Sequence, residues 1–88
     1  MKLEGKFAVV TGGAHGIGEG LARAFMDAGA RQVAVLDLDL EGAKKVALDI
    51  GGVAHQLDVR DEAKTRALFA ELEAAHGPID LLCANAGI

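Results

Sequence analysis

The fold of this chain is decided by one stretch of sequence, Phe7-Ala8-Val9-Val10-Thr11-Gly12-Gly13-Ala14-His15-Gly16-Ile17-Gly18. An apolar, strand-like run leads directly into a glycine-rich turn that opens a helix. A peptide backbone approaches a phosphate closely only where no side chain intervenes, and Gly12, Gly16 and Gly18 leave three such places. The helix that follows directs unpaired N–H groups and the positive end of its dipole at the same place. The stretch therefore predicts a turn that binds pyrophosphate.

An acidic residue at the end of the next predicted strand supports this interpretation. The apolar run Gln32–Asp37 ends in Asp37, nineteen positions after Gly18. A dinucleotide-binding unit requires a strand before its turn, a helix after it and an acid at this place. The alternative is that the twelve glycines mark only ordinary turns and helix ends. The order of strand, turn, helix and acid favours the dinucleotide site.

Three short motifs resemble the short-chain dehydrogenase/reductase family. Residues 11–18 match its Thr-Gly-x-x-x-Gly-Ile-Gly cofactor turn, and Asp58-Val59 match its acidic position after the third strand. The segment Ala84-Asn85-Ala86-Gly87 matches the family's Asn-Asn-Ala-Gly but departs from it at Ala84. The resemblance implies a Rossmann-like fold, a nicotinamide cofactor and the following cofactor-binding residues: Gly12, His15, Gly16, Ile17, Gly18, Asp37, Leu38, Asp58, Val59, Asn85, Ala86 and Gly87. Asp58 fits equally well as a strand-end carboxylate that accepts backbone N–H groups.

Asp37 favours NAD over NADP. A carboxylate at this strand end accepts hydrogen bonds from both ribose hydroxyls of NAD, whereas the 2′-phosphate of NADP would bring a second negative charge against it. Leu38, the next residue, offers no cation to offset that repulsion. His15 stands where NADP-using relatives often carry Arg or Lys, but a histidine is mostly neutral at pH 7 and binds phosphate poorly. We therefore expect NAD.

Strand-like and helix-like segments alternate along the chain. The predicted strands span residues 7–11, 32–37, 53–59 and 79–84, with a helix in each interval. Asp39 and Asp61 are the expected N-caps of the second and third helices. The apolar faces expected for the three helices are Ile17, Leu21, Ala24, Phe25 and Ala28 in the first, Ala43, Val46, Ala47 and Ile50 in the second, and Leu68, Leu72 and Ala75 in the third.

Strands that are separated by helices run parallel, and right-handed crossovers fix the order in which they lie. We predict a doubly wound parallel α/β sheet of strand order 3-2-1-4, with the ligand crevice at the carboxyl ends of strands one and four. Residues 1–88 are expected to be the N-terminal part of a single dinucleotide-binding domain, which precedes the catalytic half.

Composition excludes several classes of protein. With 51% hydrophobic residues and a net charge of −4, the chain carries no basic patch for nucleic acid. The apolar run near the N-terminus is too short for a secretory signal or a membrane span, which favours the cytoplasm. The lone Cys83 forms no internal disulfide and is expected to be a buried small hydrophobe.

The resemblance also says what the chain lacks. The chemistry of the family depends on a Tyr-x-x-x-Lys pair with a Ser, and this chain contains no tyrosine. We therefore assign no residue to catalysis, and none to a metal. Two interpretations remain: the chain is part of a longer, homo-oligomeric oxidoreductase that acts on a small alcohol or ketone, or it is a non-catalytic nucleotide-binding or regulatory module. The apolar strand 79–84 would be an exposed sheet edge in an 88-residue protein, which favours the longer enzyme.

Overall fold

The computed structural model describes residues 3–84, which form four strands and three helices in strict alternation. The strands form one parallel sheet of order β3-β2-β1-β4, so the predicted fold class and strand order are confirmed. The elements are β1 (Phe7–Thr11), α1 (Gly16–Asp27), β2 (Gln32–Asp37), α2 (Leu40–Ile50), β3 (Val53–Gln56), α3 (Glu62–His76) and β4 (Leu81–Ala84).

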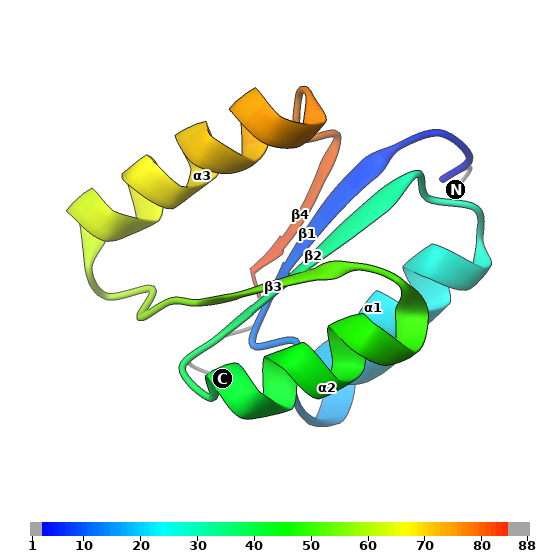
Figure 1. Cartoon of the computed structure of the whole chain (residues 1–88), viewed down its shortest axis with the longest axis horizontal. Coiled ribbons are helices and arrows are strands. Elements are labelled where there is room, and N and C mark those ends of the chain that lie inside the picture. The colour runs from blue at the N-terminus through cyan, green and yellow to red at the C-terminus, as the bar shows by residue number, and fades with distance from the viewer. Residues whose placement is uncertain (1–2, 85–88) are drawn as a thin grey trace.

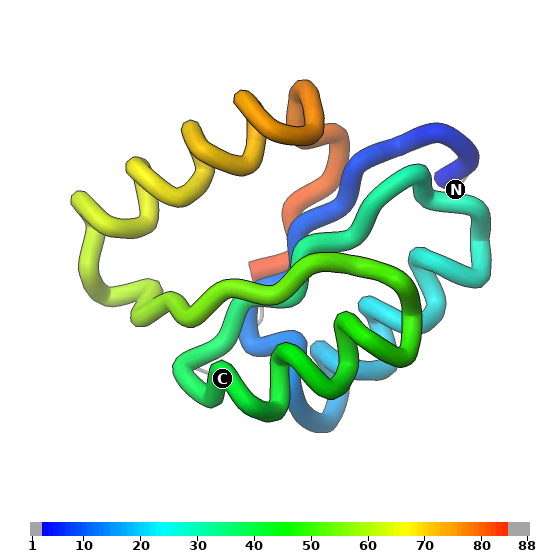
Figure 2. The backbone as a smooth tube through the Cα atoms, in the orientation of Figure 1, coloured from blue at the N-terminus to red at the C-terminus, as the bar shows by residue number. Residues whose placement is uncertain are grey.

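The two central strands explain why helices lie on both sides of the sheet. Successive side chains of a strand point to opposite faces. In β1, Ala8 and Val10 join the core beneath α1 and α2, whereas Phe7 and Val9 join a second core beneath α3. Figures 1 and 2 show the result, with α1 and α2 together on one face of the sheet and α3 alone on the other.

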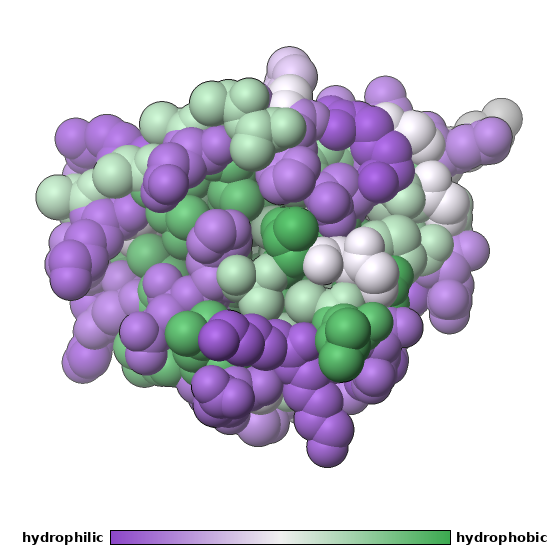
Figure 3. Space-filling view, viewed as in Figure 1, coloured by the Kyte–Doolittle hydropathy of each residue, from purple (hydrophilic) through white to green (hydrophobic). Residues whose placement is uncertain are grey.

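The core beneath α3 is the less covered of the two. Leu68 and Leu72 are the buried residues of this helix, and they pack in the cluster that contains Leu36 and Leu57. Hydrophobic residues remain visible between α3 and β3 in the space-filling view (Figure 3). Ala75, which we expected on the same apolar face, is exposed.

Two of the three helices begin at aspartates, as predicted. The side chain of Asp39 accepts a hydrogen bond from the N–H of Gly42, and the side chain of Asp61 accepts one from the N–H of Lys64. Each of these caps satisfies one of the unpaired donors in a first helical turn. α1 ends in a Schellman motif, in which Gly29 has a φ of 96°.

The apolar stripe of α1 differs from the prediction. Its buried residues are Gly18, Ala22 and Phe25, whereas Ile17 and Ala24 are exposed. Two of the three residues that α1 buries, Gly18 and Ala22, are small, and Phe25 is the large one. Helical spacing alone did not distinguish the predicted set of apolar residues from the buried set, because the members of both sets recur at helical intervals.

Strands β3 and β4 are shorter than predicted. β3 ends at Gln56, where its partner Asp37 is the last residue of β2, so no neighbour continues the ladder to residue 59. β4 begins at Leu81, which pairs with Ala8. Just before it, the carboxylate of Asp80 accepts the N–H of Phe7 at 2.8 Å and replaces a regular ladder bond.

No helix among residues 3–84 is long and apolar enough to cross a membrane.

Candidate functional site

The glycine-rich turn lies at the carboxyl end of β1 and requires glycine at two positions. Gly12 has a φ of 66° and Gly16 a φ of 55°, in the left-handed region that disfavours a side chain. Among the described residues, 3–84, no atom lies within 4 Å of a Cβ added at Gly16. The space beside this backbone is therefore open to a ligand rather than filled by the protein.

Gly13 has a different role in the same turn. A Cβ at this position would lie 2.9 Å from a methyl group of Val35 and 3.3 Å from the carbonyl oxygen of Val10. Its N–H donates to the carbonyl oxygen of Leu36 at 3.2 Å. Gly13 thus lets the turn pack against β2. This role of Gly13 was not predicted from the sequence, although the pair Gly12-Gly13 was a visible signal.

The start of α1 lacks the side-chain cap that α2 and α3 possess. His15 occupies the N-cap position in an extended conformation, and its side chain makes no capping hydrogen bond. Glu19, in the first turn, is held by Arg23 through a bond of 2.9 Å. The N–H groups at this helix end therefore face the open space beside Gly16 without a capping side chain, as an anion-binding helix start requires.

Asp37 lies within hydrogen-bond distance of the turn. Its Oδ2 accepts the N–H of Ala14 at 3.1 Å, and its Oδ1 accepts the N–H of Asp39 at 2.9 Å. The carboxylate is half-buried and held from both sides. The structure thus brings the predicted strand-end acid and the predicted glycine turn together, across 23 positions of sequence.

A second acid, Asp39, also contacts the turn. Its Oδ2 lies 2.7 Å from Nε2 of His15. The pKa of Asp39 is lowered, first by the hydrogen bond from the N–H of Gly42 and then by the bond to the His15 side chain. From sequence, Asp39 was predicted only to cap α2, because nothing in the local pattern pairs it with a residue 24 positions earlier.

Asp58 is engaged by its near neighbour Arg60. Its Oδ1 accepts both the backbone N–H and Nε of Arg60 at 3.0 Å, and Oδ2 lies 3.0 Å from the terminal guanidinium nitrogen. These bonds lower the pKa of Asp58, with the guanidinium as the largest cause. The bond from the backbone N–H agrees with the interpretation of Asp58 as a structural carboxylate, while its half-buried position at the carboxyl edge of the sheet leaves room for a ligand contact.

This pairing gives a pH-dependent prediction. Replacing Arg60 with Ala removes the guanidinium, so the pKa of Asp58 should rise toward its ordinary value, as measured by NMR titration of the carboxyl carbon. A pKa lowered by folding stabilises the folded state above the unfolded-state value and loses that contribution as pH falls through the folded value. Arg66→Ala, which removes the partner of Glu62 instead, should leave the Asp58 titration unchanged. An unaltered titration in Arg60→Ala would refute the assignment.

Exposed apolar side chains gather at the same edge of the sheet. Among the described residues, three of the exposed large hydrophobics follow the carboxyl ends of β1, β2 and β3: Ile17 at 74% exposure, Leu38 at 58% and Val59 at 38%. The carboxyl ends of parallel strands meet at one edge. All three were predicted cofactor contacts. Their exposure is what a surface for an apolar ring would require.

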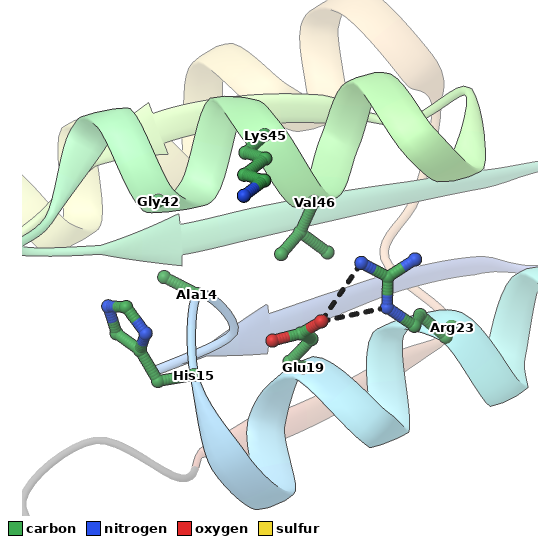
Figure 4. Close-up of a pocket in the computed structure, with 7 residues that line it drawn as sticks. All are labelled: Ala14, His15, Glu19, Arg23, Gly42, Lys45 and Val46. Carbon is green, nitrogen blue, oxygen red and sulfur yellow. Dashed lines mark hydrogen bonds and ion pairs between the residues drawn. The ribbon is translucent and has the colours of Figure 1, made fainter.

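A hollow of about 180 Å³ opens beside the turn, between α1 and α2. Figure 4 shows Ala14 and His15 at one end of it, with Glu19 and Arg23 on α1 opposite Lys45 on α2. Arg23 also bonds to Asp49 at 3.1 Å. Charged groups of both signs therefore line the hollow together with His15.

The remaining predicted residues divide into two groups. Gly18 is buried where α1 meets the sheet, so it serves packing as well as the turn. Asn85, Ala86 and Gly87 lie outside the described residues. β4, which precedes them, is paired with β1, and the hydroxyl of Thr11 donates to the carbonyl oxygen of Cys83 at 3.4 Å. Cys83 itself is half-buried rather than fully buried.

Comparison with known proteins supports the same interpretation. A sorbitol dehydrogenase from Cereibacter sphaeroides is 44% identical over 90 residues, which cover 100% of this chain and 35% of that enzyme. A hydroxysteroid dehydrogenase structure from Escherichia coli matches with a TM-score of 0.86 and 35% identity, over 99% of this chain and 39% of that one. A Brucella melitensis 16M structure described as ribose-5-phosphate isomerase gives a TM-score of 0.92 and 39% identity, over 99% of this chain and 34% of that one.

The chain spans about a third of the length of the curated relatives it matches. Its own sequence matches the family described as short chain dehydrogenase over residues 6–88. This match includes the glycine turn, Asp37 and every strand of the sheet. The chain therefore belongs to the short chain dehydrogenase family.

Proposed function

We propose that this chain is the NAD-binding part of an oxidoreductase that transfers a hydride between the nicotinamide and a small alcohol or ketone. The observation that carries the proposal is the position of Asp37. Its carboxylate lies at the carboxyl end of β2 and accepts the N–H of Ala14, inside the glycine turn. An acid in contact with a phosphate-type turn matches the two ends of an adenosine diphosphate: ribose hydroxyls at one, pyrophosphate at the other.

The pyrophosphate would lie against the turn. In the described part of the chain no atom lies within 4 Å of a prospective Cβ at Gly16, and α1 begins without a side-chain cap. Backbone N–H groups and the helix dipole both favour a negative group there. No cationic side chain is required at this point, because the N–H groups and the dipole already favour an anion.

The adenosine would lie further along the sheet edge. Asp37 would accept the ribose hydroxyls, while Leu38 and Val59 would cover the adenine ring with apolar surface. Asp58, held by Arg60, would stand beside the ring and offer a carboxylate to it. When bound, the nicotinamide cofactor carries the hydride, and the residues of this chain bind and orient it.

The proton step needs groups that this chain does not supply. The sequence contains no tyrosine, and no residue in it has been assigned an acid–base role. We place that group elsewhere in the natural polypeptide that contains residues 1–88. The names of the relatives that are called dehydrogenases fit a cofactor-binding part that is shared while the substrate part varies.

The test is a fluorescence titration of the natural polypeptide containing residues 1–88 with NADH and with NADPH. NADH should bind at least about tenfold more tightly, a difference of about 1.4 kcal/mol. Asp37→Ala should weaken NADH binding and strengthen NADPH binding, so that the two affinities converge. Asp49→Ala removes an exposed carboxylate from the far part of α2 and serves as the control for net charge.

Two results would contradict the proposal in different ways. Equal affinities of the unmodified protein would reject the preference for NAD. Failure to bind either dinucleotide would reject the dinucleotide site. It would also reject the alternative that the chain is a non-catalytic dinucleotide-binding module. Turnover of NADH with a ketone separates the enzyme from a non-catalytic binding module.

A further inference from the structure

Arg60 holds the carboxylate of Asp58 by three hydrogen bonds in the loop that follows β3. Its backbone N–H and its Nε both donate to Oδ1, and a terminal guanidinium nitrogen donates to Oδ2, each at 3.0 Å. An ionised carboxylate offers about four acceptor sites. Arg60 occupies three of these sites and leaves one, on Oδ2, for another donor.

The backbone around this pair is fixed independently of the guanidinium. The N–H of Arg60 closes an Asx turn with the Asp58 side chain, and the N–H of Asp61 donates to the Asp58 carbonyl oxygen at 2.9 Å. Asp61 then caps α3 through the N–H of Lys64. A shorter side chain at position 60 would keep all of these bonds. The guanidinium therefore adds only the two bonds that orient the Asp58 carboxylate.

The free acceptor site lies beside the position proposed for the adenosine. The N–H of Leu57, the residue before Asp58, donates to the carbonyl oxygen of Asp37 at 3.0 Å. The side-chain amide of Gln56 donates to the carbonyl oxygen of Leu38, also at 3.0 Å. These bonds join the end of β3 to the end of β2, where the ribose would bind. The base is the next group of the nucleotide, so it would reach the loop that Asp58 begins.

We propose that Arg60 is a positioning residue of the cofactor site, which holds the Asp58 carboxylate so that Oδ2 accepts the exocyclic amino group of adenine. This inference rests on the proposed dinucleotide function. An aspartate carboxylate turns readily about its last side-chain bond, whereas the planar fork of an arginine fixes both oxygens at once. A carboxylate that is oriented before the ligand arrives does not have to be ordered on binding.

The charge of Arg60 supports the same role. The Arg60 guanidinium, as the largest cause, and Lys64, as a smaller one, lower the pKa of Asp58, so the carboxylate stays ionised and can only accept. The amino group is a donor at the edge of the adenine ring, where the neighbouring ring nitrogen N7 is an acceptor. The pair is therefore complementary to a base that carries an amino group and not to one that carries an oxygen there.

The experiment titrates the natural polypeptide containing residues 1–88 with NADH and with its hypoxanthine analogue, in which a carbonyl oxygen replaces the amino group. The unmodified protein should bind NADH about tenfold more tightly, because the oxygen brings a second acceptor against Oδ2. Arg60→Ala should lower this ratio of affinities at least about threefold, since the carboxylate is no longer held. The side chain of Arg60 is 83% exposed, so the melting temperature should change by no more than about 2 °C.

Two further variants separate orientation from charge. Arg60→Lys keeps the positive charge but has one nitrogen in place of the fork, so the ratio should fall as it does in Arg60→Ala. A ratio equal to that of the unmodified protein would show that charge alone suffices and would overturn the holding role. Arg66→Ala is the matched control, because it removes a guanidinium that bonds to Glu62 on α3. Its ratio should be unchanged, and a loss of the same size there would also overturn the inference.

A double-mutant cycle tests whether Arg60 acts through Asp58. Asp58→Ala removes the acceptor, so this variant should bind NADH and the hypoxanthine analogue with affinities within about twofold of each other. In that background Arg60→Ala should change the ratio no further, because the residue that it positions is already absent. An equal loss in both backgrounds would mean that the guanidinium contacts the base itself, which contradicts a positioning role.

The outcomes distinguish this inference from the proposed function. A protein that prefers NADH to NADPH but binds NADH and the hypoxanthine analogue equally would retain the proposed function and overturn the role of Arg60. A protein that binds no dinucleotide would overturn both. An unchanged ratio in folded Arg60→Ala counts against the inference. If that variant does not fold, Arg60→Lys, which keeps the charge, decides the question by the same ratio.

Discussion

Replacing Gly16 with Val should weaken NADH binding at least about hundredfold, equivalent to about 2.8 kcal/mol, and leave the fold intact. No atom of residues 3–84 lies within 4 Å of the prospective Cβ, so we expect the new side chain to enter the ligand space rather than the core. There it would separate the pyrophosphate from the N–H groups at the start of α1. Titration with NADH and thermal unfolding of the same variant measure the two halves of the prediction.

Gly5→Val is the matched control for backbone strain. Gly5 has a φ of 73°, close to the 55° of Gly16, and also has no protein atom within 4 Å of a prospective Cβ. It precedes β1, whereas the turn follows that strand. Both variants should lose a similar amount of stability, about 1 kcal/mol for a left-handed residue with a side chain, but only Gly16→Val should lose NADH. A folded Gly16→Val protein with unchanged affinity would place the phosphate elsewhere.

The architecture followed from sequence because its determinants are local and repeated. Glycine after each of the first two helices, aspartate before the second and third, and apolar runs between them mark every element boundary to within a few residues. Helices that carry the chain back require parallel strands, and the handedness of crossovers leaves few possible orders. The observed order β3-β2-β1-β4 is the one that these rules predicted.

The predictions were wrong where the end of a strand or the burial of a side chain depends on a partner far along the chain. Residues 57–59 have the composition of a strand, yet β2 ends at Asp37, so the pairing stops after the N–H of Leu57 donates to the carbonyl oxygen of Asp37. The stripe of α1 is set by which side chains fit against the sheet, and Gly18 and Ala22 fit more closely than Ile17. Periodicity locates a helix but does not measure how closely two surfaces approach.

The candidate site divides in the same way. Asp37 and the glycine turn were found from sequence because their spacing reflects a known geometry. The bond between His15 and Asp39 was not, because it depends on the orientations of two exposed side chains 24 positions apart. Gly13 was missed because its need for a small side chain arises from Val35 on the neighbouring strand.

The two glycines that follow α2 allow the cost of a steric clash to be compared with the cost of a strained backbone conformation. Gly52→Ala should lower the free energy of unfolding by about 3 kcal/mol, at the upper end of the range for overpacked sites. A Cβ at Gly52 would lie 2.4 Å from the carbonyl oxygen of Val33, and this atom belongs to the backbone of buried β2. No side-chain rotation relieves such a contact, so the chain must shift where β3 begins.

Gly51→Ala supplies the comparison at the adjacent position. Gly51 has a φ of 77° and no protein atom within 4 Å of its prospective Cβ, so its replacement costs only the left-handed conformation, about 1 kcal/mol. Urea unfolding of both variants in the natural polypeptide containing residues 1–88 gives the two values. Because Val53 pairs with Ala34 and Gln56 with Asp37, a displaced β3 should also disturb the end of β2, and Gly52→Ala alone should weaken NADH binding. Equal losses of stability at the two positions would mean that β3 moves away from β2 more easily than the 2.4 Å contact implies.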